Sequence, residues 1–94
     1  MVTWDEKKAR KNKDKHSVEF QDAAIALEDE YALSAPDNDH NEPRWNALCE
    51  DPYGRILFVS YTYIAEDEIK IISARMADKK QKRAYNNRRF RNEY

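Results

Sequence analysis

The chain has 94 residues, 40% of them hydrophobic and 37% charged, and its 17 Lys and Arg nearly balance its 18 Asp and Glu. That size holds one modest core, so we expect a single domain over residues 1–94, and the 12% of aromatic residues argues against general disorder. No apolar run is long enough to cross a membrane, and the start of the chain lacks a signal-peptide pattern, which predicts a soluble, cytoplasmic protein without membrane association. A single cysteine excludes an intrachain disulfide and a cysteine-based zinc site.

The charges are distributed unevenly along the chain. Lysines and arginines dominate residues 7–15 and 79–91, whereas the acids of residues 19–51 are opposed only by Arg44. A basic run is as often a solvated helix face as a binding surface. A polyanion responds to the local electrostatic field rather than to the net charge of −1. The two basic ends are therefore compatible with a nucleic-acid partner.

Two helices are predicted in the first third of the chain. Residues 4–15 should form a mostly solvated helix capped by Asp5, because Trp4 and Ala9 are its only apolar side chains. A second helix is predicted to begin at Ser17, whose hydroxyl suits an N-cap. Its apolar positions recur at i, i+3, i+4 and i+7, and they are Phe20, Ala23, Ala24 and Leu27. This spacing places them on one face, so we expect the second helix to pack on the core.

Four strands are predicted next, at residues 31–35, 44–49, 55–64 and 68–75. The third is almost entirely β-branched or aromatic, and Pro52 and Gly54 mark a hairpin turn before it. The fourth is apolar on both faces, which is typical of a central strand. The side chains expected to be buried in these last two strands are Leu57, Phe58, Val59, Ile71 and Ile72.

Asp78 and Gln81 have the spacing of a capping box and should start a last, basic helix. Further along, only Phe90 and Tyr94 offer apolar anchors, so residues 86–94 are expected to be an extended or loosely helical basic tail. The order helix, helix, strands, helix predicts an α+β fold, in which the helices gather on one side of a twisted antiparallel sheet.

Metal binding and thiol chemistry are disfavoured. The stretch "DNDHN" at residues 37–41 imitates the start of a calcium loop, but the sixth and twelfth positions hold Glu42 and Leu48 instead of glycine and an acid. Two histidines without cysteine partners make a poor transition-metal site. Cys49 alternates inward on its strand and precedes two acids, which suits a small buried side chain better than a reactive thiol. We therefore expect no cofactor.

Arg75 comes at the end of a strand that should be central, and a basic helix follows it. An arginine in such a place needs an anionic partner. Residue types alone leave two choices open. The partner is either a carboxylate of the chain, with Asp39 and Glu42 as the candidates, or a phosphate of a ligand.

Five blocks of the sequence, in this order, resemble the BrnT toxin family, and they are "WDEKKARKNKDKHSVEF", "HNEPRW", "ILFVSYT", "IKIISARMA" and "KRAY". Each block alone is a weak signal, but five in the family's order are specific. Ser17 stands where the family generally has glycine, and Lys70 replaces a common arginine. The resemblance implies a RelE-like fold and a bacterial ribonuclease toxin of a type II toxin–antitoxin module.

The resemblance also implies chemistry at the polar block that contains His40, Glu42 and Arg44. In RNA transesterification the 2′-hydroxyl attacks the adjacent phosphate and the 5′-oxygen leaves, which needs a proton acceptor, a proton donor and fixed positive charge but no metal. We expect Arg44 and Arg75 to bind the phosphate and His40 to be the acid or base, because histidine titrates near neutral pH. Tyr85 is a reserve catalytic candidate. The RNA-binding candidates, of which the first two are also catalytic reserves, are Lys15, His16, Lys79, Lys80 and Arg83.

The family further implies a protein partner. A BrnA-like, DNA-binding antitoxin should neutralise the toxin in a heterotetramer, and operator DNA should be reached only through that antitoxin. An alternative from another class stays open. The chain could be a non-catalytic module whose sheet and basic helix only hold an acidic protein or a nucleic acid.

Overall fold

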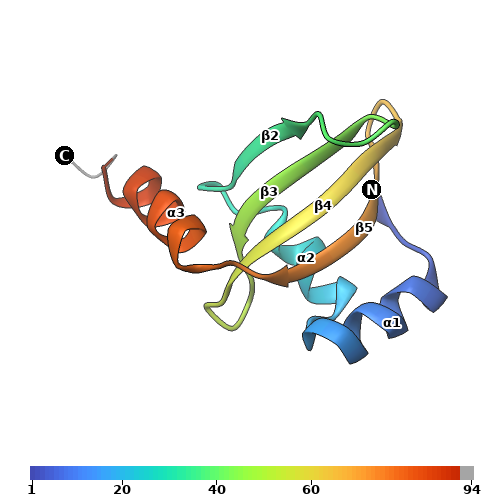
Figure 1. Cartoon of the computed structure of the whole chain (residues 1–94), viewed down its shortest axis with the longest axis horizontal. Coiled ribbons are helices and arrows are strands. Elements are labelled where there is room, and N and C mark those ends of the chain that lie inside the picture. The colour runs from blue at the N-terminus through green and yellow to red at the C-terminus, as the bar shows by residue number, and fades with distance from the viewer. Residues whose placement is uncertain (92–94) are drawn as a thin grey trace.

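The computed structural model describes residues 1–91, which form a five-stranded sheet with two helices on one face and a third helix at one end (Figure 1). The elements are β1 (Val2–Thr3), α1 (Glu6–His16), α2 (Phe20–Ala26), β2 (Leu33–Asp37), β3 (Arg44–Glu50), β4 (Ile56–Ala65), β5 (Glu68–Met76) and α3 (Lys79–Arg91). The strand order is β1-β5-β4-β3-β2, and β2 to β5 form the predicted antiparallel meander. The predicted α+β class is confirmed, although β4 rather than β5 is the central strand.

β1 is an element that the sequence patterns do not predict. Val2 and Thr3 pair in parallel with Ile69 and Lys70 of β5, and the Ile69 N–H donates to the Met1 carbonyl at 2.9 Å. The sheet is therefore mixed rather than wholly antiparallel. Two residues are too few to show the alternation by which a strand is recognised.

The main core lies between the sheet and the first two helices. The register aligns Ala47 of β3, Val59 of β4 and Ala74 of β5 in one row, and all three are buried. Phe20 and Ala23 of α2 are buried in the same apolar cluster. The i, i+3 spacing of the sequence therefore predicted the packed face of α2 correctly.

The opposite face of the sheet carries the alternate row Leu48, Phe58 and Arg75, and we call it the open face. At one end of this face, Tyr85 of α3 packs with Leu48 and Ile56. Within residues 1–91 no other helix covers the open face (Figure 1), and Phe58 and Arg75 are only half-buried on it. The sequence predicted all helices on one side of the sheet. This is wrong for α3, which packs on the end of the opposite face.

Two of the side chains predicted to be buried are only half-buried, namely Phe58 and Ile72. Phe58 lies on the open face. Ile72 falls at a bulge, where the pairing of β5 with β4 shifts register and leaves this residue without a partner. The other three are buried as predicted, and they are Leu57, Val59 and Ile71.

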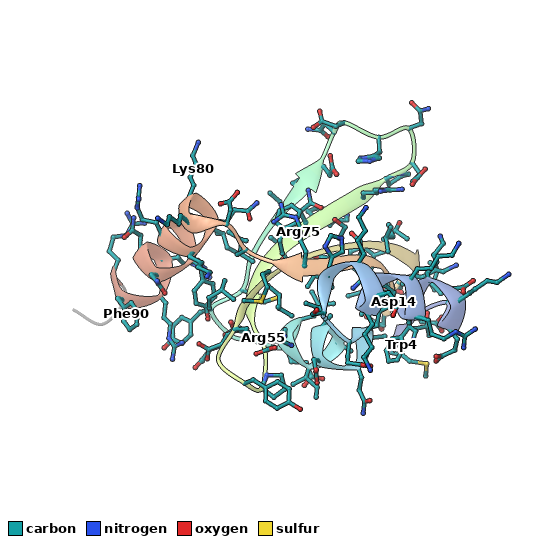
Figure 2. The ribbon with its side chains drawn as sticks, turned by 60° about the horizontal axis from the view of Figure 1, so that its bottom comes forward. Trp4, Asp14, Arg55, Arg75, Lys80 and Phe90 are labelled. Atoms are coloured by element: carbon teal, nitrogen blue, oxygen red, sulfur yellow. The ribbon has the colours of Figure 1, made fainter. Side chains whose placement is uncertain are left out.

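The basic C-terminal segment is helical. α3 continues to Arg91, so of the two forms expected for the tail, extended or loosely helical, residues 86–91 take the helical one. Phe90 does not anchor this segment, because 51% of its surface is exposed at the far end of α3 (Figure 2). The other expected anchor, Tyr94, lies outside the described residues.

Ser17 ends α1 instead of capping α2, which corrects the predicted N-cap. Its backbone is left-handed, with φ 59° and ψ 31°, and its N–H donates to the Lys13 carbonyl. α2 begins at Phe20, after Glu19, whose side chain makes no cap hydrogen bond. A left-handed helix terminus is the position that favours glycine, which gives a physical reason for the glycine of the resembled family.

Replacing Ser17 with glycine should therefore stabilise the fold. Relief of the left-handed strain, less the greater chain entropy of glycine, should raise the free energy of unfolding by about 1 kcal/mol. For a domain of this size that is a rise of about 4–8 °C in Tm, measurable by calorimetry. Ser17→Ala is the matched control, because it removes the hydroxyl and keeps the β-carbon. An equal gain in Ser17→Ala would contradict this explanation.

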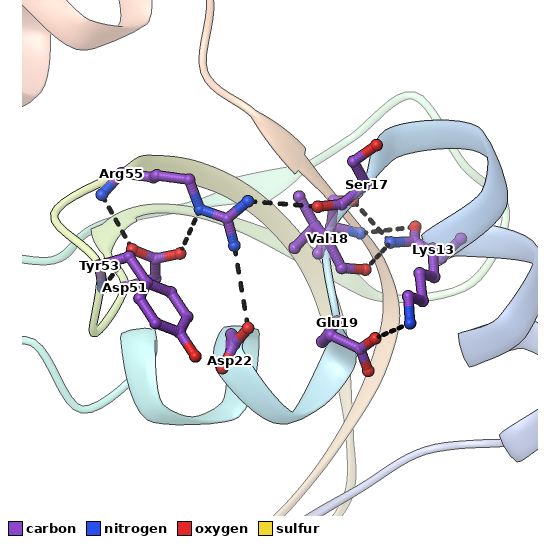
Figure 3. Close-up of polar contacts among 10 residues, drawn as sticks. Lys13, Ser17, Val18, Glu19, Asp22, Asp51, Tyr53 and Arg55 are labelled. Carbon is purple, nitrogen blue, oxygen red and sulfur yellow. Dashed lines mark hydrogen bonds and ion pairs between the residues drawn. The ribbon is translucent and has the colours of Figure 1, made fainter.

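Arg55 fastens the junction of α1 and α2 to the turn between β3 and β4 (Figure 3). Its Nε donates to Asp51 Oδ2 at 2.6 Å, its Nη1 donates to the Ser17 carbonyl at 3.2 Å, and its Nη2 lies 3.8 Å from Asp22 Oδ2. The turn has the predicted form, since the Gly54 N–H donates to the Asp51 carbonyl and Gly54 has φ 82°. Arg55 is thus a structural arginine with two carboxylate neighbours.

Candidate active site

Arg75 is held in a fixed position at the end of β5, between α1 and α3 (Figure 2). Its guanidinium carbon lies 4.4 Å from the centre of the ring of Phe58, its partner residue on β4. Its Nη1 donates to the Met76 carbonyl at 3.0 Å and to Gln81 Oε1 at 3.2 Å. The side chain therefore points toward the start of α3, where Gln81 lies. A stacked and hydrogen-bonded guanidinium needs little reorganisation to meet an anion.

No carboxylate pairs with Arg75 among residues 1–91, in contrast to Arg55. Neither of the two acids that the sequence offered as partners, Glu42 and Asp39, contacts Arg75. Glu42 Oε1 accepts from Arg44 Nε at 2.6 Å, and no ion pair joins Asp39 to Arg75. The half-buried guanidinium is therefore available to a phosphate.

Gln81 links Arg75 to the start of α3. The predicted capping box is present, because the Asp78 N–H donates to Gln81 Oε1 at 2.9 Å and the Gln81 N–H donates to Asp78 Oδ1 at 2.8 Å. The same Oε1 accepts from Arg75, so one amide group caps the helix and orients the arginine.

α1 forms a wall beside the open face at the edge of β5. Asn12, which is buried, donates to the Ala74 carbonyl at 2.8 Å and accepts from the Ala74 N–H at 3.0 Å, so that it pairs with the strand edge as another strand would. Its Nδ2 also donates to the Val18 carbonyl at 3.0 Å. These hydrogen bonds of Asn12 fix α1 against the edge of β5.

A cleft of about 330 Å³ lies between α1 and β5. Its lining consists of Lys8, Lys11, Asn12, Lys15, His16, Ile72 and Ser73. Ser73 is two residues from Arg75, and its partner Ser60 is on the same face of β4 as Phe58, the partner of Arg75. Alternate residues of a strand share a face, so Ser73 and Arg75 leave β5 on the same face. Two of the RNA-binding candidates, Lys15 and His16, therefore line a cleft whose β5 wall lies two residues from Arg75.

Arg44 is on the open face but far from Arg75. It precedes Trp45, whose partner on β4 is Tyr61, whereas Arg75 pairs with Phe58. At ~3.3 Å per residue and ~4.8 Å per strand, the two Cα atoms are on the order of 16 Å apart. In this arrangement the two guanidinium groups are engaged at different ends of the open face, Arg44 by Glu42 and Arg75 by Gln81.

His40 lies in the loop between β2 and β3, at the same distant end as Arg44. Its Nδ1 is 3.1 Å from Asp37 Oδ2, and 44% of its side chain is exposed. A backbone hydrogen bond from Asp39 is the main cause that lowers the pKa of Asp37. The stretch that contains His40 is thus a charged rim of the open face, set apart from Arg75.

Tyr85 is placed in the core and not on the open surface. Its side chain is fully buried, and its hydroxyl donates to Asp29 Oδ2 at 2.5 Å. Burial, together with this hydrogen bond to a carboxylate, raises the pKa of Tyr85 well above the usual range. A buried tyrosine whose hydroxyl is engaged by Asp29 is not exposed to RNA in this structure, and its packing anchors α3 to the sheet.

The remaining RNA-binding candidates are Lys79, Lys80 and Arg83, which are exposed on α3; Lys80 is labelled in Figure 2. They extend the positive surface on the other side of Arg75. None of them forms an ion pair among the described residues. They therefore fit electrostatic contacts to a backbone better than fixed contacts to a reacting group.

Cys49 is inert, as predicted, because it is completely buried and burial raises the pKa of its thiol to about 12. Within residues 1–91, no three histidine, cysteine, aspartate or glutamate side chains are grouped so that they could hold a metal ion. In the same part of the chain, no helix has the length and apolar character needed to cross a bilayer.

The comparison with known families decides the identity. The model of the family described as "Ribonuclease toxin, BrnT, of type II toxin-antitoxin system" matches residues 4–81. The chain belongs to the BrnT family. It is therefore a ribonuclease toxin of a type II toxin–antitoxin system, and the resemblance drawn from the five sequence blocks is confirmed.

A solved BrnT structure has the same fold. The 1.1 Å crystal structure of the Brucella abortus ribonuclease toxin BrnT is 26% identical, with a TM-score of 0.67 over 83% of this chain and 96% of that chain. No protein among those with curated functions matches this chain. The BrnT blocks containing Lys15 and His16 and containing Arg75 meet at the α1–β5 cleft, whereas the block containing His40 does not.

Proposed function

We propose that this BrnT toxin cleaves RNA by metal-independent transesterification at Arg75 and the adjoining α1–β5 cleft. The observation that carries the proposal is the guanidinium of Arg75, which is fixed by Phe58 and Gln81 and has no carboxylate partner among residues 1–91. Two parallel N–H groups of such a guanidinium match two phosphate oxygens. A donor that is already in place stabilises the developing phosphorane without a cost of reorganisation.

The reaction replaces one P–O bond with another. The 2′-oxygen loses its proton to a base and forms a bond to the adjacent phosphorus, while the bond to the 5′-oxygen breaks and that oxygen takes a proton from an acid. The products are a 2′,3′-cyclic phosphate and a free 5′-hydroxyl. Acid–base groups near neutral pH serve this chemistry best.

His16 is the residue we assign to proton transfer in place of His40. It lines the same cleft as Ser73, which shares a strand face with Arg75. Lys15, also in the cleft, adds positive charge near the phosphate. His40 and Arg44 lie at the other end of the open face, where we assign them to RNA backbone contacts away from the bond that is cleaved.

α3 supplies further contacts to RNA. Lys79, Lys80 and Arg83 are exposed along a helix that starts next to Arg75. Exposed lysines neutralise backbone phosphates without reading the base sequence. The RNA strand would then run between α1 and α3 over Arg75.

For the antitoxin we propose a BrnA-like, DNA-binding protein that forms a heterotetramer with the toxin and carries it to operator DNA. A type II toxin has an antitoxin partner by the definition of the class. α1 has a single buried residue, Asn12, and a highly basic outer surface. An acidic or amphipathic segment laid over that surface would cover the cleft and block RNA.

Expression of the chain alone should stop bacterial growth, and co-expression with its antitoxin should restore it. The pair should elute as a single species in size-exclusion chromatography. A non-catalytic binding module, the alternative function, would be tolerated by the cell when expressed alone. Two separate elution peaks would contradict the proposed complex, and undisturbed growth would contradict the proposed activity.

A further inference from the structure

The outer surface of α1 carries a row of lysines that form no direct ion pair with an acid among residues 1–91. Lys8, Lys11 and Lys15 follow one another at i, i+3 and i+7, which places them on one helix face beside His16. None of these three lysines forms an ion pair among residues 1–91, whereas Lys13 on another face is paired with Glu19 at 2.8 Å. Like charges at this spacing repel one another, so an anion bound between them would relieve an existing cost.

The floor of the same cleft is apolar. Ile72 is the residue that the bulge in β5 leaves unpaired, and it is half-exposed among the lysines. A bulge re-aims a side chain at sites next to active centres. Ser73 adds one hydroxyl beside this floor, so the cleft combines an apolar surface, a hydrogen-bonding group and a cationic rim.

We propose that this cleft binds one unpaired nucleotide of the RNA, with its base on Ile72 and its phosphates on Lys8, Lys11 and Lys15. The volume of 330 Å³ lies at the small end of ligand sites and is too small for a double helix. A paired base hides its faces in the stack, whereas single strands offer them to a protein. The inference rests on the proposed function, because the strand held in the cleft would have to place the phosphate that is cleaved at Arg75.

Binding can be measured without cleavage by fluorescence anisotropy with a labelled, 2′-O-methylated single strand of roughly 12 nucleotides. Lys11→Ala and Lys15→Ala should each weaken binding roughly threefold to tenfold and lower the slope of log K against log salt by about 0.7. Ile72→Ala should weaken binding roughly fivefold and leave that slope unchanged, because it removes apolar contact and no charge.

Arg10→Ala is the matched control, since it removes one positive charge from the same helix on the face away from the cleft. Equal losses in Arg10→Ala and Lys11→Ala would overturn the proposal, and so would equally tight binding of a duplex of the same length. The proposed function has a separate failure. If Arg75→Ala still cleaved RNA while the cleft variants lost affinity, the cleft would stand as a binding site and the assignment of Arg75 would fall.

Discussion

Arg75→Ala should abolish RNA cleavage and toxicity while leaving the fold intact. The arginine leaves a rigid strand, stacks on Phe58 and has no carboxylate partner among the described residues, so its loss removes a preorganised donor and leaves no buried charge unpaired. Removal of one such donor typically lowers the rate by about 10²–10³. The rate of RNA cleavage by the purified variant is the measurement. Circular dichroism and co-elution with the antitoxin should match the parent chain.

Three further variants define the role of Arg75. Arg75→Lys should restore little activity, because a single ammonium group cannot reproduce the two-pronged contact. Lys79→Ala and Lys82→Ala remove exposed charges from α3 and should weaken RNA binding only modestly, in a salt-dependent way. A folded Arg75→Ala protein that cleaves RNA at the parent rate would remove this residue from the site.

Tyr85→Ala should cause the largest loss of stability. Tyr85 is the largest fully buried side chain and joins α3 to the sheet through Leu48 and Ile56. Truncation of a buried aromatic residue costs about 3–5 kcal/mol. Chemical denaturation should therefore show a midpoint far below that of the parent chain, or a protein that fails to fold.

Tyr85→Phe separates the hydrogen bond from the packing. It leaves the ring in place but removes one donor to Asp29, which should cost about 1.5–3 kcal/mol. The purified variant should still cleave RNA at the parent rate below its lowered Tm. Unchanged stability with lost cleavage would instead make the hydroxyl a catalytic group.

The same variant should be more sensitive to acid. Burial raises the pKa of Asp29, but hydrogen bonds from Tyr85, Glu50 N–H and Tyr31 N–H outweigh it and lower the pKa below the ordinary value. The stabilisation is therefore present above the ordinary carboxyl pKa and disappears as the pH falls through the lowered value. Because Tyr85→Phe brings the folded-state pKa back up, its acid unfolding should begin at a higher pH.

Local sequence patterns predicted most of the elements of this fold. Apolar spacing identified α2, β-branched and aromatic residues identified β4, and the pairs Asp78–Gln81 and Pro52–Gly54 identified a helix start and a turn. What the patterns missed depends on the rest of the molecule. Two residues become β1 only because β5 offers an edge, and the left-handed backbone of Ser17 is set by the junction of two helices.

The candidate site was predictable in part. Arg75 was singled out because it stands at the end of a strand, and its contacts with Phe58 and Gln81 support the proposal that it binds phosphate. Tyr85, by contrast, has the residue type of a catalytic group but the location of a core residue, which sequence position alone does not reveal. Ile72 looked like a core residue and became the floor of the cleft because a bulge turned it outward. The sequence signal for the cleft was the unpaired lysine row of α1.

We propose that this toxin cleaves RNA with Arg75 and without a metal ion. The decisive measurement is incubation of the purified protein with RNA in EDTA, with the products analysed for their end groups. We expect cleavage that EDTA does not inhibit, fragments that end in a 2′,3′-cyclic phosphate, and no fragments from Arg75→Ala. RNA that stays intact with the folded parent protein, or cleavage that EDTA abolishes, would contradict it.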